Sequence, residues 1–238
     1  MTIGCRVVRR EDERLLRGHG RFVGDHRAQG EAHVVLVRSP HAHARLLDID
    51  TAQAHAMPGV LGVFTGDDWR AEGFGELPCL WRVDSSDGTR MREAPRPAIV
   101  ACDGGRGVVR HVGDVVAAVV ATSALEAMDA AEMVATAYEP LPSAVCTARA
   151  LDVDAPVVHQ AFGTNLCFDI TFGDQAAVAD AMEHAAHVTE LTLVNHRVAP
   201  CPMEPRAAFG VYDSDDDRYT LWRRTKNDPR CGARFRPK

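Results

Sequence analysis

Short aliphatic and β-branched runs alternate with polar breaks through the first half of the chain. They have the length of strands, and glycine, proline or charged residues separate them. The runs cover residues 32–37, 44–50, 60–65, 97–100, 107–110 and 115–121. One or two helical turns fit residues 51–57. Residues 66–96 form a long polar insertion, and such a loop in a compact domain is usually functional or partly disordered.

The strongest helix signal follows the last of these runs. Ser123 and Glu126 have the spacing of a capping box. Apolar side chains then recur on one predicted helix face, namely Leu125, Met128, Ala131, Val134 and Tyr138. Residues 138–145 are expected to leave the helix as an edge strand, because their prolines cannot donate to a ladder. A strand, a capped helix and a returning strand predict an α/β sandwich.

A second and smaller unit is predicted beyond a linker at residues 151–165. Its strand signals cover residues 168–173, 187–194, 207–212 and 218–222, with a helix from Asp174 to about His184. The acidic turn at 213–217 lacks the glycine and the distal glutamate of a calcium loop, which favours a solvated hairpin turn. Residues 230–238 are basic and carry no periodic pattern.

Composition and charge narrow the class of protein. With 238 residues, 46% apolar and 25% charged, the chain has an ordinary globular balance. Its net charge of −6 gives no general attraction to nucleic acid or to anionic membranes. The longest apolar run, 115–121, is far shorter than the roughly 20 residues of a membrane span. No apolar run follows the N-terminal arginines, so we expect no signal peptide and a cytoplasmic location.

Few residues form a recognisable chemical motif. The seven cysteines include no CxxC pair, so the sequence offers no iron–sulfur or zinc ligand set, and we expect reduced thiols. Gly18, Gly20 and Gly24 lack the spacing and the strand–helix context of a dinucleotide loop. His41 and His43 would share one face of a strand, but no third ligand stands nearby in sequence. We therefore interpret both histidines as structural.

Glu204 is a stronger candidate. Prolines flank this carboxylate on an otherwise apolar loop, and burial there would raise its pKa. An ion pair with Arg206 is the alternative interpretation.

Five stretches together resemble the large, molybdenum-binding subunit of the xanthine dehydrogenase, aldehyde oxidase and carbon monoxide dehydrogenase family. They are residues 18–25, Arg38-Ser39-Pro40-His41-Ala42-His43-Ala44, residues 112–120, Tyr138-Glu139-Pro140-Leu141-Pro142, and Met203-Glu204-Pro205-Arg206 with Leu221-Trp222. Each stretch is weak alone, but their order and spacing are specific. The likeness runs from about residue 6 to residue 227.

The resemblance implies an α+β fold in two parts. After an N-terminal segment at 1–30, residues 15–150 would form the family's α/β hammerhead domain, a mixed sheet with packed helices. Residues 166–238 would form an incomplete start of the molybdopterin-binding domain. Family members hydroxylate a heterocycle or an aldehyde with oxygen from water, or oxidise carbon monoxide. Electrons then pass to a small [2Fe–2S] subunit and a medium FAD subunit, which would be the partners of this chain.

The departures from the family set the expected limits of this chain. The family's glycine-rich cofactor loop and the family's C-terminal catalytic glutamate have no counterpart in this chain. The family's Thr-Gln-Asn reads Thr225-Lys226-Asn227, and a lysine cannot accept a hydrogen bond as glutamine does. We therefore expect a truncated or frameshifted chain that is inactive alone, with Glu204, Lys226 and Asn227 at the cofactor and neither a catalytic residue nor a metal ligand. The cofactor would be molybdopterin in its cytosine dinucleotide form, not bound stably by this fragment.

A non-catalytic role is the alternative. The hammerhead domain would then serve as an assembly module that binds the iron–sulfur or FAD subunit. The sequence leaves the substrate undetermined.

Overall fold

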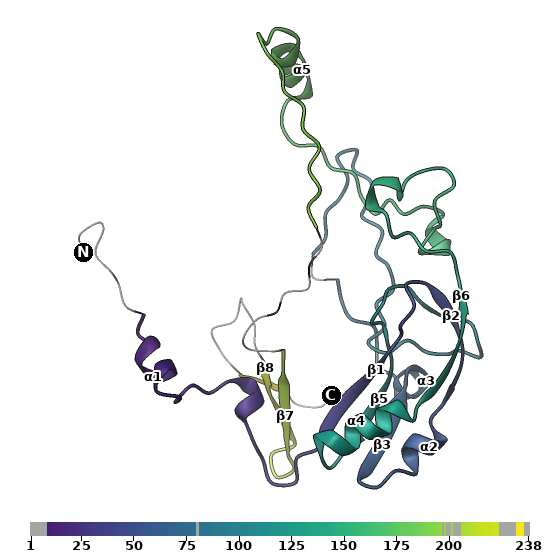
Figure 1. The fold of residues 1–238 in the computed structure, drawn as a ribbon, viewed down its shortest axis with the longest axis vertical. Coiled ribbons are helices and arrows are strands. Elements are labelled where there is room, and N and C mark those ends of the chain that lie inside the picture. Colours follow the sequence, from purple (N-terminus) through teal and green to yellow (C-terminus); the bar gives the residue numbers. More distant parts are fainter. Residues whose placement is uncertain are drawn as a thin grey trace. The chain divides into compact units, whose positions relative to one another are not determined.

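The computed structural model divides the chain into two units by its backbone contacts. One unit is residues 30–188, and the other joins residues 1–29 to residues 189–238. The structure describes residues 9–79, 81–196, 198, 201, 206–223 and the backbone of 232–235. Figure 1 shows the elements along the chain, and each unit is described by itself.

The first sheet is built around β5, a central strand with apolar residues on both faces. Its order is β1–β5–β3, with both pairs antiparallel. The three strands are β1 (His33–Arg38), β5 (Val115–Ala121) and β3 (Val60–Thr65). Val119 of β5 lies opposite Val35 on one side and Val63 on the other. The three strands predicted here are confirmed.

The second sheet has the order β4–β2–β6 and is also antiparallel. Its strands are β4 (Gly107–Val109), β2 (Ala44–Asp50) and β6 (Ala135–Pro140). Two of them match the prediction closely. The third, β6, begins at Ala135 rather than at Tyr138, so Tyr138 belongs to a strand and not to the helix face on which we placed it.

Two adjoining apolar clusters include residues of β5. The first joins β5 to the helices and consists of Ala54, Val63, Ala117, Val119, Ala130 and Val134. The second joins β5 to the second sheet and consists of Ala44, Leu46, Val100, Val109 and Val116. Because neighbouring residues of a strand point to opposite faces, Val116 and Ala117 enter different clusters. One strand therefore connects both halves of the core.

Helix α4 (Ala124–Glu132) begins at Ser123 as predicted, but it buries a different face. The Ser123 hydroxyl accepts a hydrogen bond from the Glu126 N–H at 3.3 Å. Ala127 and Ala130 are fully buried against the first sheet, whereas Leu125 and Met128 are 73% and 55% exposed. The helix packs closely on the strands because alanines leave room for that approach. The predicted apolar face was wrong at Leu125 and Met128, whereas Ala131 and Val134 of that prediction do pack in the core.

Two further helices of this unit flank β3. They are α2 (Ala52–His55), as predicted, and α3 (Gly66–Ala71), which occupies the start of the insertion expected to be a loop. Thr65 caps α3 by accepting from the Asp68 N–H at 3.3 Å. A β-carbon on Gly66 would lie 2.3 Å from the Ala101 nitrogen, so this glycine lets the helix touch the 100–101 backbone.

The predicted strand at 97–100 does not form. These residues are irregular, although the Val100 N–H donates to the Val115 carbonyl at 2.7 Å. A β-carbon on Gly107 would lie 1.9 Å from the Ala101 carbonyl oxygen. Gly66 and Gly107 thus bring neighbouring backbone close to the end of this segment. That end has no free edge at which another strand could pair.

The remainder of this unit is mostly irregular. It holds the short 3-10 helices η2 (Thr147–Arg149) and η3 (Gln160–Phe162), and helix α5 (Gln175–Glu183). Asp174 caps α5 through its carboxylate, as predicted, with the Ala177 N–H at 3.0 Å. The strands predicted at 168–173 and 187–194 do not form, because neither run has a partner strand among the residues described.

The other unit combines an early and a late segment of the chain. It contains α1 (Asp12–Leu16), the 3-10 helix η1 (Val23–Asp25) and a sheet of order β7–β8–β9. Its strands are β7 (Ala208–Asp213), β8 (Arg218–Arg223) and β9 (Gly232–Phe235). The predicted hairpin with its acidic turn is confirmed. β9 was missed, because the basic stretch at 230–238 gives no strand pattern.

The fold class is α+β, as predicted. The described strand pairs are all antiparallel, so the mixed sheet that we expected is two antiparallel sheets. Helix α4 connects β5 of the first sheet to β6 of the second sheet. A helix that links two parallel strands needs both strands in the same sheet, so α4 does not create a parallel pair.

Gly59 offers a test of the packing at the start of α4. Its φ is +76°, and an added β-carbon would lie 2.3 Å from the Glu126 carboxylate, which accepts from the Ser123 hydroxyl at 2.8 Å. Gly88 has a similar φ of +83° but open space around it. Both Gly59→Ala and Gly88→Ala should lose about 1 kcal/mol from the left-handed backbone. We expect Gly59→Ala to lose clearly more in urea unfolding, and equal losses would contradict this packing.

Candidate functional site

The stretch Arg38–Arg45 binds the turn that precedes β5. The Ser39 N–H donates to the Asp114 carbonyl at 2.8 Å, and the Gly113 N–H donates back to the Ser39 carbonyl at 2.8 Å. The Arg38 guanidinium donates to the Gly113 carbonyl at 2.7 Å. Ser39 is 2% exposed, so its two backbone bonds lie away from water, whereas the bond from Arg38 is exposed. They tie the end of β1 to the start of β5.

His41 and His43 do not converge on a common ligand position. The His41 ring packs against Tyr138, with ring centroids 4.8 Å apart. Nδ1 of His43 lies 2.6 Å from the Pro142 carbonyl oxygen, and the Leu141 N–H donates to the His43 carbonyl at 2.9 Å. Both contacts are with the extended segment after α4. They agree with our structural interpretation of the two histidines.

Three of the five stretches that carry the family resemblance therefore meet in one hydrogen-bonded junction. Residues 38–44 contact residues 112–114 on one side and residues 138–142 on the other. The other two stretches, residues 18–25 and the one that includes Leu221-Trp222, belong to the other unit. There the His26 ring, directly after the first of them, stacks on Phe209 at 5.9 Å and on Trp222 at 5.6 Å. No pattern in the sequence had indicated that His26 would join this aromatic cluster.

Arg110, which follows β4, attaches the linker to the sheet region. Nε of Arg110 donates to the Val158 carbonyl at 3.3 Å, and the Val158 N–H donates to the Asn165 amide oxygen at 2.9 Å. Burial lowers the pKa of His159, and the charges of Arg110 and His43 lower it further. Burial first, and the charge of Arg110 second, therefore favour the neutral form of His159.

This pKa shift predicts a pH-dependent stability. A histidine with a depressed folded-state pKa stabilises the protein fully above the unfolded value of about 6.5, and that contribution is lost as pH falls from there through the folded pKa. Urea unfolding between pH 7.5 and 5 should show less loss of stability in His159→Gln than in the wild type. His184→Gln is the control, because His184 is exposed at the end of α5. Equal pH slopes in all three proteins would contradict the assignment.

The polar insertion is held by the segment that follows the linker. The Ser86 N–H donates to the Asp169 carbonyl at 2.9 Å, and the Asp169 N–H donates to the Ser85 hydroxyl at 3.0 Å. The Trp81 and Phe168 rings meet edge to face at 5.5 Å. The insertion thus has a structural partner, and its serines bind backbone atoms in place of a strand.

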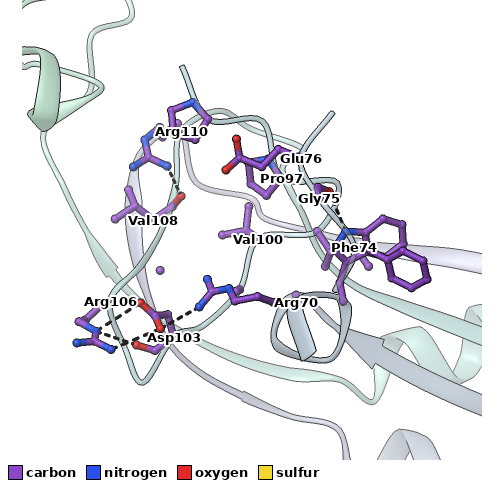
Figure 2. Close-up of a pocket in the computed structure, with 16 residues that line it drawn as sticks. Arg70, Phe74, Gly75, Glu76, Pro97, Val100, Asp103, Arg106, Val108 and Arg110 are labelled. Carbon is purple, nitrogen blue, oxygen red and sulfur yellow. Dashed lines mark hydrogen bonds and ion pairs between the residues drawn. The ribbon is translucent and has the colours of Figure 1, made fainter. Parts of the chain in front are cut away.

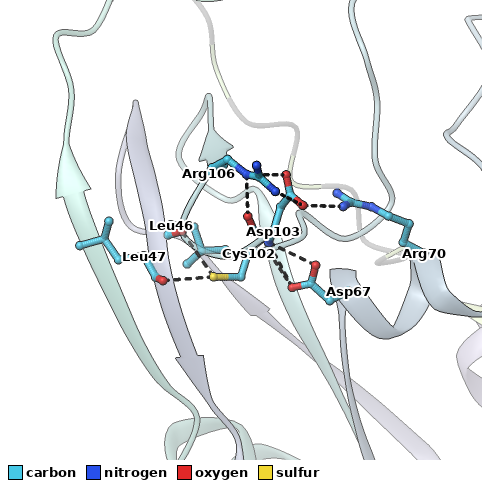
Figure 3. A network of polar contacts seen from close by, with 7 residues as sticks. All are labelled: Leu46, Leu47, Asp67, Arg70, Cys102, Asp103 and Arg106. Atoms are coloured by element: carbon cyan, nitrogen blue, oxygen red, sulfur yellow. Dashed lines mark hydrogen bonds and ion pairs between the residues drawn. The ribbon is translucent and has the colours of Figure 1, made fainter.

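A polar network closes the 101–107 turn (Figure 3). The Asp67 carboxylate accepts from the Cys102 N–H at 3.0 Å and from the Asp103 N–H at 3.2 Å. Asp103 has a φ of 51°, a left-handed conformation that aspartate tolerates. Its carboxylate accepts from Arg70 at 3.0 Å and pairs with Arg106 at 3.4 Å. These bonds, that with Arg70 foremost, lower the pKa of Asp103.

A cavity of about 360 Å³ lies beside this network (Figure 2). Its charged side chains are Arg70, Glu76, Asp103, Arg106 and Arg110, and its rings are Trp69 and Phe74. Figure 2 shows the arginines and Asp103 on one side and Phe74 on the other. Sequence reasoning missed this cavity, because its lining comes from α3, the insertion and β4, which are far apart in the chain.

The residues predicted at the cofactor, Glu204, Lys226 and Asn227, all lie outside the described residues. Their roles stay predictions. Within the described part of the chain, no group of three or more His, Cys, Asp or Glu side chains is placed to hold a metal ion. No described helix is long and apolar enough to cross a membrane.

Two known domain families match successive parts of the sequence. The model of the aldehyde oxidase and xanthine dehydrogenase a/b hammerhead domain matches residues 17–142. The model of the molybdopterin cofactor-binding domain matches residues 158–231.

Individual proteins and solved structures match the chain as well. The nicotine 6-hydroxylase large subunit of Paenarthrobacter nicotinovorans is 35% identical, over 93% of this chain and 26% of that protein. The carbon monoxide dehydrogenase large chain of Afipia carboxidovorans is 32% identical, over 92% and 27%. The structure of quinoline 2-oxidoreductase from Pseudomonas putida 86 superposes with a TM-score of 0.77 at 33% identity, over 93% of this chain and 26% of that chain.

These matches define the class as molybdopterin-dependent oxidoreductases. The chain belongs to the aldehyde oxidase and xanthine dehydrogenase family, as the five sequence stretches predicted. It spans about a quarter of the length of the relatives it matches.

Proposed function

We propose that this chain is part of the large subunit of a molybdenum hydroxylase, in which residues 15–150 form the hammerhead domain and residues 166–238 begin the cofactor-binding domain. The observation that carries this is the ordered match of both domain models along one chain. Its substrate would be a heterocycle, an aldehyde or carbon monoxide. The chain spans 26% of the nicotine 6-hydroxylase large subunit, and we propose that these residues alone do not catalyse the reaction.

The proposed cofactor contacts are Glu204, Lys226 and Asn227. The N–H groups of a lysine and an asparagine suit the carbonyl and phosphate oxygens of a pterin cofactor, so the donor set fits the group. Glu204 would support the site through hydrogen bonds rather than through the metal. When bound, the molybdenum cofactor, in its cytosine dinucleotide form, supplies the oxidation that adds oxygen from water to the substrate carbon. Lys226 would orient the cofactor as a donor only.

Metal analysis tests this part of the proposal. The chain, expressed in cells that make molybdopterin cytosine dinucleotide, should retain well below one molybdenum atom per protein. Lys226→Gln restores a side chain that both donates and accepts, so we expect it to retain more cofactor than the wild type. Elemental analysis and pterin fluorescence measure both. Stoichiometric molybdenum in the wild-type chain would contradict the proposal.

An assembly role for the hammerhead domain is the second candidate, and one surface favours it. The face of the first sheet that points away from α4 is apolar, with Val34, Leu36 and Phe64 58%, 41% and 50% exposed. Val120 and Ala118 lie between them in the strand register. We name these five residues the outer face. A partly exposed apolar sheet face of this kind is typical of a protein contact.

We expect the outer face to bind the small [2Fe–2S] subunit or the medium FAD subunit. Cys79, Cys102, Cys146 and Cys167 carry free thiols, which supports assembly in the reducing cytoplasm. Phe64→Ser should weaken the complex at least about tenfold in size-exclusion and calorimetric titrations, because a buried aromatic contact is lost. Leu151→Ser is the matched control, since Leu151 is 63% exposed outside the sheet. Unchanged binding by Phe64→Ser would contradict this candidate.

A further inference from the structure

The cavity beside α3 has more positive than negative charge on its lining. Three guanidinium groups, those of Arg70, Arg106 and Arg110, face two carboxylates, those of Glu76 and Asp103. Asp103 alone serves as the counterion of both Arg70, at 3.0 Å, and Arg106, at 3.4 Å. One carboxylate cannot neutralise two guanidinium groups. The pair therefore keeps unused N–H donors and a net positive charge at this end of the cavity.

Arg110 adds a third cation to the lining. Its guanidinium donates to the Val108 carbonyl at 3.0 Å and to the Val158 carbonyl at 3.3 Å. Burial lowers the pKa of Arg110, and the charge of Asp114 acts in the opposite direction. An arginine remains protonated in this setting. Among the described residues, the hydrogen bonds of this guanidinium go to neutral carbonyl oxygens, so a partly buried cation gains from an anion that enters the cavity.

The opposite end of the cavity is apolar and aromatic. The Trp69 and Phe74 rings contact each other with centroids 4.6 Å apart, and the Trp69 N–H donates to the Gly75 carbonyl at 3.2 Å. Pro97 and Ile99 extend this wall. Phe74 is 57% exposed, so its ring is open to a ligand. Figure 2 shows Phe74 across the cavity from Arg106 and Asp103, with Pro97 beside the Glu76 carboxylate.

We propose that this cavity binds a small aromatic acid, with its carboxylate at the arginines and its ring against Trp69 and Phe74. A volume of about 360 Å³ is enough for one small ligand. Guanidinium groups bind carboxylates through paired hydrogen bonds, and aromatic walls hold planar rings. The site lies wholly within residues 66–110 and does not depend on the proposed molybdenum chemistry.

Calorimetric titration of the full chain tests this site with three probes. Benzoate carries both the charge and the ring, benzamide is its neutral counterpart, and inorganic phosphate carries the charge alone. We expect benzoate to bind at least about tenfold more tightly than either of the others at low salt, because only benzoate uses both ends of the cavity. Saturable benzoate binding that equals benzamide or phosphate binding would overturn the proposal, as would no binding.

Substitutions test whether benzoate binds in this cavity. Arg106→Gln and Phe74→Ala should each weaken benzoate binding at least about tenfold. Their controls are Arg149→Gln and Phe172→Ala, which change an exposed arginine and a phenylalanine that is 84% exposed, both outside the cavity lining. Circular dichroism checks the folding of each variant. If a variant does not fold, the benzoate and benzamide comparison on the wild type still decides. Wild-type affinity in both cavity variants would overturn the proposal.

Discussion

The burial of β5 is the constraint on which the hammerhead region depends. Ala117 and Val119 pack in the cluster that includes Ala130 of α4, and Val116 packs in the cluster with residues of the second sheet. All three side chains of β5 are fully buried. Ala118 and Val120 lie on the remaining part of the strand, within the outer face. A strand this apolar is most stable in the centre of a sheet, where both of its edges are paired. The order β1–β5–β3 meets that requirement.

The junction around Ser39 fixes how the strands enter this arrangement. Its paired backbone bonds with residues 113–114 bring the end of β1 to the start of β5, and His43 ties in the segment after β6. Polar backbone groups that are buried must find partners, and here they find each other. The histidines of this stretch first suggested metal chemistry. Their contacts instead join this stretch to residues 138–142.

Charged side chains are distributed unevenly around the two sheets. The Asp67 carboxylate accepts from the backbone of the 101–107 turn, and the Asp103 carboxylate pairs with Arg70 and Arg106. Arg110 donates to a carbonyl of the linker. The same arginines line a cavity whose other wall is aromatic. Stability and binding can thus share side chains, because an arginine has five N–H donors and rarely uses all of them for folding. The link between the hammerhead region and the linker depends on the same group.

The sequence alone determined four strands of the first and second sheets, the hairpin of β7 and β8, two helix caps and the family. Periodicity identified β1, β2, β3 and β5, since alternation and β-branching are local properties, and Ser123 and Asp174 marked helix starts through local hydrogen bonds. Tertiary structure decided which helix face is buried: Ala127 and Ala130 fit against the sheet where Leu125 and Met128 do not. It also decided that Tyr138 lies in a strand and that residues 97–100 form none. The arginine and aromatic cavity was not predictable, because its walls meet only when α3, the insertion and β4 pack together.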